Sequence, residues 1–441
     1  MLTPEENEAL CRVGPGTPMG TLLRRYWVPA FQLADLPEPD CAPIKVTILG
    51  ENFVAFRDTQ GRIGFLDELC PHRGASLVLG RVEDCGIRCL YHGWKYAVDG
   101  TIMETPNLTG SRFTERVKHG SYPVKESGGL GWVYLGPPDT APPFPIFRWD
   151  GAPADEVAVT EMIMDCNWMQ VLEGSIDSSH VGVLHLDTLA VMGAGPRNVG
   201  SFEFAGDPWD HDMPTPPRGD NPWPSHDNAP VIEVEDTPFG FHYAALREAA
   251  DGSGSKYVRI TAFVMPYTAF VGGSNGAVIV VPRDDHTCSS FGIFMVPKGR
   301  GGSAAANRAG IDRSIWGPEP GNRRMRIPPQ DREAMANGQS FAGFRGGNRV
   351  QDGAVQMSSG PLYDRAKEHL VPADLAIIRL RRVLADSIRL VDEGKPPLGL
   401  GVGYDFARVT AASATIDAET PWQDLVSGNL GTREGTARIG T

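Results

Sequence analysis

Two short motifs, Cys70-x-His72 and Cys89-x-x-His92, constrain this chain more than any other feature of its sequence. Each motif offers one thiolate and one imidazole, and sixteen residues separate His72 from Cys89. Such ligands suit zinc or iron–sulfur chemistry, although zinc sites more usually combine C-x-x-C pairs with histidine pairs or use four cysteines. The motifs therefore predict a metal centre held between two loops, with zinc as an alternative to iron and sulfide.

Short β-strands are predicted around both motifs. Between residues 44 and 136 the chain contains apolar runs such as IKVTILG, FVAFRD and GLGWVYLG, and Asp99-Gly100 is a strong two-residue hairpin signal. The chain has 52 glycines and 37 prolines, which favours loops and short strands over long helical bundles. The proline-dense stretch 137–147 cannot form a regular element, so a domain boundary is expected there.

Composition argues against several classes of protein. The formal net charge is −13 and the pI is about 5.3, which disfavours a nucleic-acid-binding surface. Seven cysteines in 441 residues do not resemble the disulfide framework of a secreted protein, so reduced thiols and a cytoplasmic location are expected. No stretch approaches ~20 consecutive apolar residues, so no membrane span is predicted.

The two motifs, together with the sequence YHGW, resemble the Rieske [2Fe–2S] motif. The resemblance implies that Cys70 and Cys89 bind one iron and that His72 and His92 bind the other, which raises the reduction potential above that of all-cysteine clusters. Neither loop contains the additional cysteine of the respiratory-chain type, so the ferredoxin or oxygenase type is indicated. Cys85 lies outside the motif and is expected to be an ordinary reduced thiol.

A second candidate site lies in the stretch NWMQVLEGSIDSSHVGVLH. On a continuous helix, Glu173, Asp177 and His180 share one face because they are spaced by four and three residues. His180 and His185 are five residues apart, or about 140° around an ideal helix, so they would not easily reach one atom. A local break near Gly182 is therefore expected.

This pattern resembles the mononuclear iron motif of Rieske ring-hydroxylating oxygenases, which bind iron through two histidines and one carboxylate. The resemblance implies that His180 and His185 are the histidine ligands. Asp352, in the segment VQDGAVQMSSGPLYDR, takes the position of the carboxylate ligand, and Asp364 is an alternative. Without the upstream motif, buried structural histidines would be the default interpretation of His180 and His185.

The resemblance covers residues 26 to about 390 and implies the activity of the oxygenase alpha subunit. In this family a reductase passes electrons from NAD(P)H to the cluster and then to Fe(II), where O₂ is reduced and inserted into substrate. A head-to-tail trimer is also implied, in which Asp177 bridges His180 and the partner subunit's His92. An acceptor carboxylate there would orient a ligand imidazole and couple the protonation of that imidazole to the redox state of the cluster. Glu173 is a weaker candidate for contact with the ligands.

Three segments, QDREAMANGQSF, VQDGAVQMSSGPLYDRAKEHL and DLAIIRLRRVL, resemble the phthalate dioxygenase branch of the family. That resemblance implies an aromatic carboxylate substrate, a flavin/iron–sulfur reductase, and a homotrimer or a hexamer of stacked trimers. A buried carboxylate favours arginine partners, and Arg247 and Arg259 are the best candidates, followed by Arg197. An apolar wall is expected from Phe202, Phe204, Val264 and Phe270.

The type of oxidation stays open in the sequence. Dihydroxylation is expected, and monohydroxylation or O-demethylation by the same iron is the alternative. An electron-transfer protein without catalysis is a second alternative, from a different class. Such a carrier would not need the second metal site, so the 180/185/352 triad separates these interpretations.

The expected fold is α+β. Residues 1–25 should form a helix that packs on the catalytic domain, residues 26–140 a small β-rich Rieske domain, and residues 150–441 the catalytic domain. Apolar residues at 377, 380, 384, 388 and 391 have helical spacing and predict a long C-terminal helix. An antiparallel sheet is expected to wrap around this helix, in a helix-grip arrangement.

Overall fold

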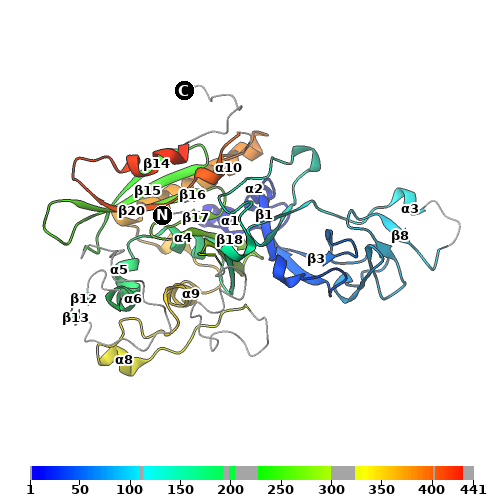
Figure 1. Ribbon diagram of the computed structural model, residues 1–441, viewed down its shortest axis with the longest axis horizontal. Coiled ribbons are helices and arrows are strands. Elements are labelled where there is room, and N and C mark those ends of the chain that lie inside the picture. Colours follow the sequence, from blue (N-terminus) through cyan, green and yellow to red (C-terminus); the bar gives the residue numbers. More distant parts are fainter. Residues whose placement is uncertain are drawn as a thin grey trace. The chain divides into compact units, whose positions relative to one another are not determined.

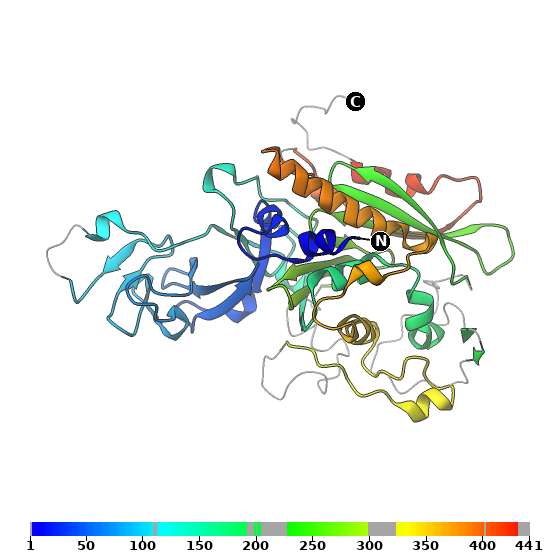
Figure 2. The same ribbon diagram turned by 180° about the vertical axis from the view of Figure 1, so that it is seen from behind.

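The computed structural model describes most of the chain and divides it into two compact units (Figures 1 and 2). The smaller unit comprises Val13–Phe144 and Val281–Asp284, and the larger comprises Met1–Arg12, Pro145–Val280 and Asp285–Thr441. The residues described are 2–108, 113–191, 198–199, 201–203, 227–298, 323–400 and 403–430. Among these residues, no helix has both the length and the apolar character needed to cross a membrane.

The N-terminal segment is divided differently from the predicted domain 1–25. Helix α1 (Pro4–Cys11) belongs to the larger unit, whereas helix α2 (Pro18–Leu23) belongs to the smaller one. Arg24, which follows α2, shows why this helix stays with the smaller unit: its guanidinium donates to the carbonyl of Leu49, in a turn, and to the carboxylate of Glu51, in the strand that follows. Only the first helix therefore packs within the larger unit.

The smaller unit consists of three antiparallel sheets. One has the order β1–β10–β9, the second β2–β3–β4 and the third β5–β6–β7–β8. Their bounds are β1 Trp27–Gln32, β2 Ile44–Ile48, β3 Glu51–Arg57, β4 Ile63–Asp67, β5 Arg81–Glu83, β6 Gly86–Arg88, β7 Lys95–Tyr96, β8 Ile102–Glu104, β9 Val124–Ser127 and β10 Leu130–Tyr134. The predicted hairpin lies between β7 and β8, where Gly100 has a φ of +78° that glycine adopts without strain.

The larger unit is built on one eight-stranded sheet. Its order is β11–β19–β18–β17–β16–β15–β14, and β20 pairs with β16. The bounds are β11 Val157–Met164, β14 Val231–Thr237, β15 Gly240–Glu248, β16 Lys256–Val264, β17 Thr268–Phe270, β18 Gly276–Pro282, β19 Cys288–Met295 and β20 Ala412–Ile416. Every pairing between β14 and β18, and that of β11 with β19, is antiparallel.

Helix α10 (Leu375–Asp392) is the predicted C-terminal helix. It contacts β14, α1 and α4 (Trp168–Ile176), and Figure 2 shows it lying along the sheet. Its buried residues recur at helical spacing, as Leu380, Leu384 and Ile388 illustrate. Helix α9 (Asn348–Ser358) contacts α4. The α+β fold, with a small β-rich part and an antiparallel sheet covered by helices, is confirmed.

Candidate metal centres

The loops that contain the two Cys/His motifs have the same backbone geometry. In the first, the amide of Cys70 donates to the carbonyl of Ala75, and the carbonyl of Cys70 accepts from the amide of Gly74, both at 2.8 Å. In the second, Cys89 makes the equivalent bonds to Trp94 and Gly93, at 2.8 and 3.0 Å. Both glycines have a positive φ, which closes each turn around its cysteine.

These two loops place both thiols and both imidazoles close together. Cys70 and Cys89 are 3% and 2% exposed and belong to one core cluster. The rings of His72 and His92 have centroids 4.5 Å apart, and the ring of His72 stacks on Trp94. Within the described residues, the buried Nδ1 of His72 has no hydrogen-bond partner. A buried polar atom without a partner fits a metal ligand, so the four side chains fit a Rieske cluster.

Tyr96, which the sequence analysis did not select, lies against one cluster cysteine. Its hydroxyl is 2.9 Å from the Sγ of Cys70, and the ring is fully buried. Burial and the adjacent Cys70 raise the pKa of the phenol, so it remains a hydrogen-bond donor. A hydrogen bond to a cluster sulfur is one of the contacts that set the reduction potential.

The second site forms where the chain leaves α4. Asp177 follows the last residue of α4, and a short helix, α5 (Val181–Leu184), separates the two candidate histidines. The predicted break near Gly182 lies instead on either side of α5. Gly182 serves a different purpose, because a Cβ there would approach the side chain of Asn228 to 2.2 Å.

The candidate ligands converge at this site. One ligand atom from each of His180, His185 and Asp352 lies within 4.8 Å of the others. The Oδ1 of Asp352 is 3.3 Å from the Nε2 of His180 and 3.1 Å from the Nε2 of His185. Within the described residues this buried oxygen makes no hydrogen bond of acceptable geometry, despite these distances. Three donor atoms around one point are what a cation such as Fe(II) would bind, and the residues fit it.

The outward nitrogen of each histidine faces a different acceptor. The Nδ1 of His180 lies 3.4 Å from the Oδ2 of Asp177, and the Nδ1 of His185 lies 2.7 Å from the Oε1 of Gln351. Such outer contacts fix the ring orientation of metal-binding histidines. Sequence reasoning selected Asp177 but missed Gln351, whose only signal was its place beside Asp352.

Electrostatics at the site favour a positive charge at the convergence point. Burial alone would lower the pKa of His180, but the carboxylates of Asp177 and Asp352 raise it to about 9. Burial likewise opposes ionisation of Asp352, yet the two histidines hold its carboxyl pKa well below the usual range. The two carboxylates therefore favour a positive charge at this site, which is the sign that a metal cation carries.

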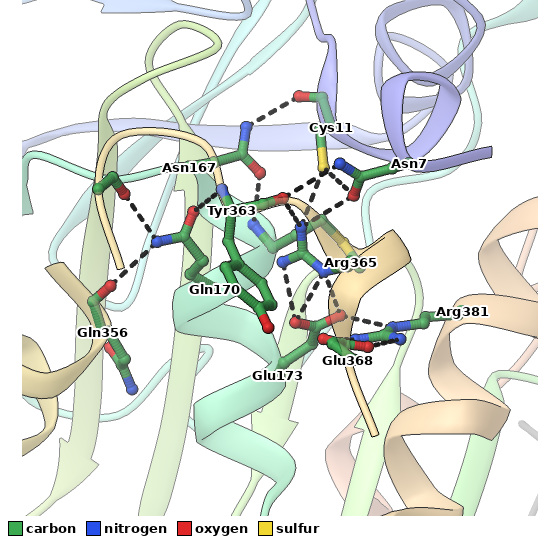
Figure 3. A network of polar contacts seen from close by, with 12 residues as sticks. Asn7, Cys11, Asn167, Gln170, Glu173, Gln356, Tyr363, Arg365, Glu368 and Arg381 are labelled. Carbon is green, nitrogen blue, oxygen red and sulfur yellow. Dashed lines mark hydrogen bonds and ion pairs between the residues drawn. The ribbon is translucent and has the colours of Figure 1, made fainter. Parts of the chain in front are cut away.

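Glu173 does not reach the iron-site residues, so the prediction of a contact there is wrong. Helix α4 ends at Ile176, and the turn that follows removes the common face expected of one continuous helix. The Glu173 carboxylate instead accepts from Arg365 at 2.9–3.1 Å and from Arg381 at 2.8 Å (Figure 3). These buried ion pairs join α4 to α10. The hydrogen bond from Arg365 to Asn7 also joins them to α1.

The predicted substrate arginines lie beside the segment that precedes His180. Arg247 and Arg259 lie on one face of the sheet, because Ala245 pairs with Arg259. The Nη2 of Arg247 donates to the carbonyl of Ser178 at 2.8 Å, and the Nη1 of Arg259 lies 3.3 Å from the Ser178 hydroxyl. Burial and the Arg259 guanidinium lower the pKa of Arg247 to about 10.

The remaining predicted residues are placed as follows. Val264 and Phe270 are buried in the larger unit, at 3% and 1% exposure. Asp364, the alternative ligand, caps the turn at Arg365–Lys367 and pairs with Lys367, so it is not part of the triad. Arg197, Phe204 and the side chain of Phe202 lie outside the described residues.

The fold, the paired Cys/His loops and the converging His180, His185 and Asp352 side chains are the arrangement expected of an iron-dependent oxygenase subunit. A model of the Rieske [2Fe–2S] domain matches residues 26–121, and one described as LigXa C-terminal domain like matches residues 133–436. The chain thus belongs to the Rieske non-heme iron oxygenases with a C-terminal domain of this type.

Two relatives that match almost the whole length of this chain are oxygenase subunits. It is 39% identical over 438 residues to the phthalate 4,5-dioxygenase oxygenase subunit of Pseudomonas putida, covering 96% of this chain and 94% of the relative. It is 32% identical over 463 residues to the 3-chlorobenzoate-3,4-dioxygenase oxygenase subunit of Comamonas testosteroni, covering 97% and 99%. A 5,5'-dehydrodivanillate O-demethylase oxygenase subunit from Sphingobium is 29% identical over 90% of this chain and 83% of its own.

Solved structures support the fold. The caffeine complex of an NdmA mutant from Pseudomonas putida CBB5 matches with a TM-score of 0.55 at 18% identity, covering 92% of this chain and all of that one. Dicamba monooxygenase bound to 3,6-dichlorosalicylic acid also has a TM-score of 0.55, at 17% identity, and covers 84% of this chain and 99% of its own.

The predicted enzyme class and cofactors are confirmed. The chain is an oxidoreductase of the Rieske type, and its cofactors are a [2Fe–2S] cluster and a mononuclear iron that uses O₂. The family therefore disfavours both alternatives, a zinc-binding structural protein and an electron carrier without catalysis. Oxygenase subunits of such systems work with a reductase that supplies electrons from NAD(P)H.

Proposed function

We propose that the chain adds both atoms of O₂ to an aromatic carboxylate of the phthalate class. The 39% identity to a phthalate 4,5-dioxygenase oxygenase subunit along almost the whole chain is the observation that carries this proposal. A dihydroxylation adds two oxygen atoms to adjacent ring carbons and consumes two electrons and two protons, which NAD(P)H and one further proton provide. A flavin/iron–sulfur reductase is the expected partner, and the cytoplasm is the expected location.

The geometry described above supports the metal ligands that we propose. Cys70 and Cys89 would hold one iron of the cluster, and His72 and His92 the other. The mononuclear iron would lie between His180, His185 and Asp352, where the ligand atoms converge. When bound, the cluster supplies single electrons and the ferrous ion supplies a site for O₂. The protein orients the ligand imidazoles and buries the side chain of His185.

Arg247 and Arg259 are the residues that we propose bind the substrate carboxylates. Both guanidinium groups reach Ser178, two residues before His180, so a carboxylate bound there would hold an aromatic ring near the triad. Arginine provides a planar pair of donors that matches a carboxylate. Arg197 remains a third, sequence-based candidate.

Asp177 is the proposed bridge for electrons between subunits of a trimer, or of a hexamer of stacked trimers. Its Oδ1 accepts from the amide and hydroxyl of Ser179, while its Oδ2 faces His180. The side chain is 22% exposed, which leaves room for a contact from a second subunit. In the smaller unit, large apolar side chains near the cluster loops are also exposed, as expected of a docking surface: Leu69, Leu79, Leu90 and Tyr91.

The bridging role is tested by Asp177→Asn. This variant should keep the cluster spectrum and the full iron content but lose most of its turnover, because an amide cannot stabilise a protonated imidazole as a carboxylate does. Single-turnover reduction of the cluster by the reductase should proceed normally in the variant. Wild-type product formation by Asp177→Asn would contradict the bridge.

The substrate class is tested with the purified protein, a flavin/iron–sulfur reductase, NADH and ¹⁸O₂. Phthalate, 3-chlorobenzoate and methoxylated benzoates are compared by oxygen uptake and by mass spectrometry of the products. The proposal predicts a phthalate-class product that contains two ¹⁸O atoms, and no product from His180→Ala. Loss of a methyl group as formaldehyde from a methoxylated acid alone would identify an O-demethylase and refute dihydroxylation.

A further inference from the structure

The side chain of Gln351 contacts one of the two iron-site histidines. Its Oε1 lies 2.7 Å from the Nδ1 of His185, and the two residues are only 2% and 3% exposed. We propose that Gln351 is a positioning residue for the mononuclear iron, which accepts the Nδ1–H of His185 and so keeps the Nε2 lone pair directed at the metal. This inference rests on the proposed ligand roles of His180, His185 and Asp352.

Consecutive residues of α9 hold the two nitrogens of the His185 ring. Gln351 faces Nδ1, and the Oδ1 of Asp352 lies 3.1 Å from Nε2. The helix itself is closely packed at this point, because a Cβ on Gly353 would approach the Sδ of Met325 to 2.4 Å. One helix therefore sets both the carboxylate ligand and the orientation of a histidine ligand.

The hydrogen bond matters because it selects the tautomer of His185. A neutral imidazole carries its single proton on either Nδ1 or Nε2, and only the form with an unprotonated Nε2 can bind a metal through that atom. An acceptor at Nδ1 stabilises this form. Since Gln351 and His185 are both buried, bulk water is poorly placed to replace the amide oxygen of Gln351.

The two histidines differ in the kind of acceptor that they face. His180 faces the Asp177 carboxylate, which is charged and 22% exposed, whereas His185 faces a neutral amide in a closed environment. A charged, accessible acceptor suits a bridge to another subunit. A neutral, enclosed acceptor suits a fixed ligand, so Gln351 should affect how tightly iron is held rather than how electrons arrive.

The test measures metal binding and needs no substrate. The mononuclear iron is removed while the cluster is kept, and the protein is titrated anaerobically with Fe(II), or with Co(II) as an absorbing probe of geometry. Gln351→Leu should weaken Fe(II) binding by about 10–100-fold and change the Co(II) spectrum, because the loss of an outer partner of a ligand has effects of this size. Gln351→Glu, which keeps an acceptor oxygen, should bind Fe(II) almost as tightly as the wild type.

Gln356→Leu is the matched control, since it makes the same change on the same helix outside the triad. It should leave Fe(II) affinity unchanged, and the cluster spectrum and unfolding midpoint show that each variant is folded. Wild-type Fe(II) affinity in Gln351→Leu would overturn the inference, as would an equal loss in Gln351→Leu and Gln351→Glu. Fe(II) binding by His180→Ala as tight as that of the wild type would overturn the ligand set itself, which separates that failure from one confined to Gln351.

Discussion

Replacing Glu173 with glutamine removes a buried negative charge that two arginines share. The Glu173 side chain is 11% exposed, and those of Arg365 and Arg381 are 0% and 6% exposed. Arg381 keeps a second, two-pronged contact with Glu368 at 2.6 and 2.8 Å. The loss therefore falls mainly on Arg365, whose guanidinium would lie among neutral partners.

The expected loss in the free energy of unfolding follows from these contacts. Removing one partner of a buried ion pair usually destabilises a protein by about 3–5 kcal/mol. The lower end, about 3 kcal/mol, is expected here because the amide oxygen of glutamine can still accept one hydrogen bond from Arg365. The double variant Glu173→Gln/Arg365→Met should recover part of this loss, since it also removes the uncompensated charge.

Urea unfolding followed by circular dichroism measures the effect. The control is Asp386→Asn, which breaks the exposed pair of Asp386 with Arg389 on α10 and should cost less than about 1 kcal/mol. A loss below about 1 kcal/mol in Glu173→Gln would refute the reasoning. So would a double variant that is less stable than the single one, because the cost would then not arise from a charge without its partner.

The lowered pKa of Glu173 predicts that the stability of the fold depends on pH. Burial would raise the pKa of Glu173, but Arg365 and Arg381 outweigh it and hold that pKa below its ordinary value of 4.5. Because the folded-state pKa is lowered, the stabilisation is complete above the unfolded-state value and is lost as the pH falls through the folded-state value. The wild type should thus lose stability below about pH 4.5 more steeply than Glu173→Gln.

Three further predictions concern the metal centres. Asp352→Asn should lower the iron content from about three atoms per chain to about two while the cluster spectrum persists, as measured by iron analysis; an unchanged iron content would exclude Asp352 as a ligand. Cys89→Ser should abolish the Rieske signal in electron paramagnetic resonance, and a normal signal would contradict the cluster assignment. Tyr96→Phe should lower the cluster's reduction potential by about 40 mV, if the lost hydrogen bond favours the reduced state by about 1 kcal/mol; protein-film voltammetry would detect it, and an unchanged potential would count against the contact.

The sequence was most informative where the ligands are local. The Cys70 and Cys89 loops are short, and each closes through a glycine four residues after its cysteine, so spacing alone indicates how the ligands are presented. Asp352 is far from His180 and His185 in the chain, and no local pattern connects them. Its assignment depended on resemblance, and the structure brings its Oδ1 within 3.3 Å of both histidines.

Helical periodicity failed where the helix ended. Glu173, Asp177 and His180 would share a face only if α4 continued, but α4 stops at Ile176 and Asp177 closes a turn with Ser179. A stop of this kind depends on tertiary contacts that a single sequence does not display. The Glu173 carboxylate instead contacts Arg365 and Arg381, and the contact with Arg381 joins α4 to α10.

The buried ion pairs of Glu173 with Arg365 and Arg381 are nevertheless connected through α4 to the triad of His180, His185 and Asp352. Glu173 holds the last turn of that helix, and the next residues, Asp177 and His180, begin the site. On the other side, α9 contacts α4 and provides both Gln351 and Asp352. The two packed helices therefore position much of the site, because Asp352 lies on α9, His180 follows α4, and Gln351 of α9 contacts His185. This explains how packed helices can position two histidines, His180 and His185, that themselves lie on turns.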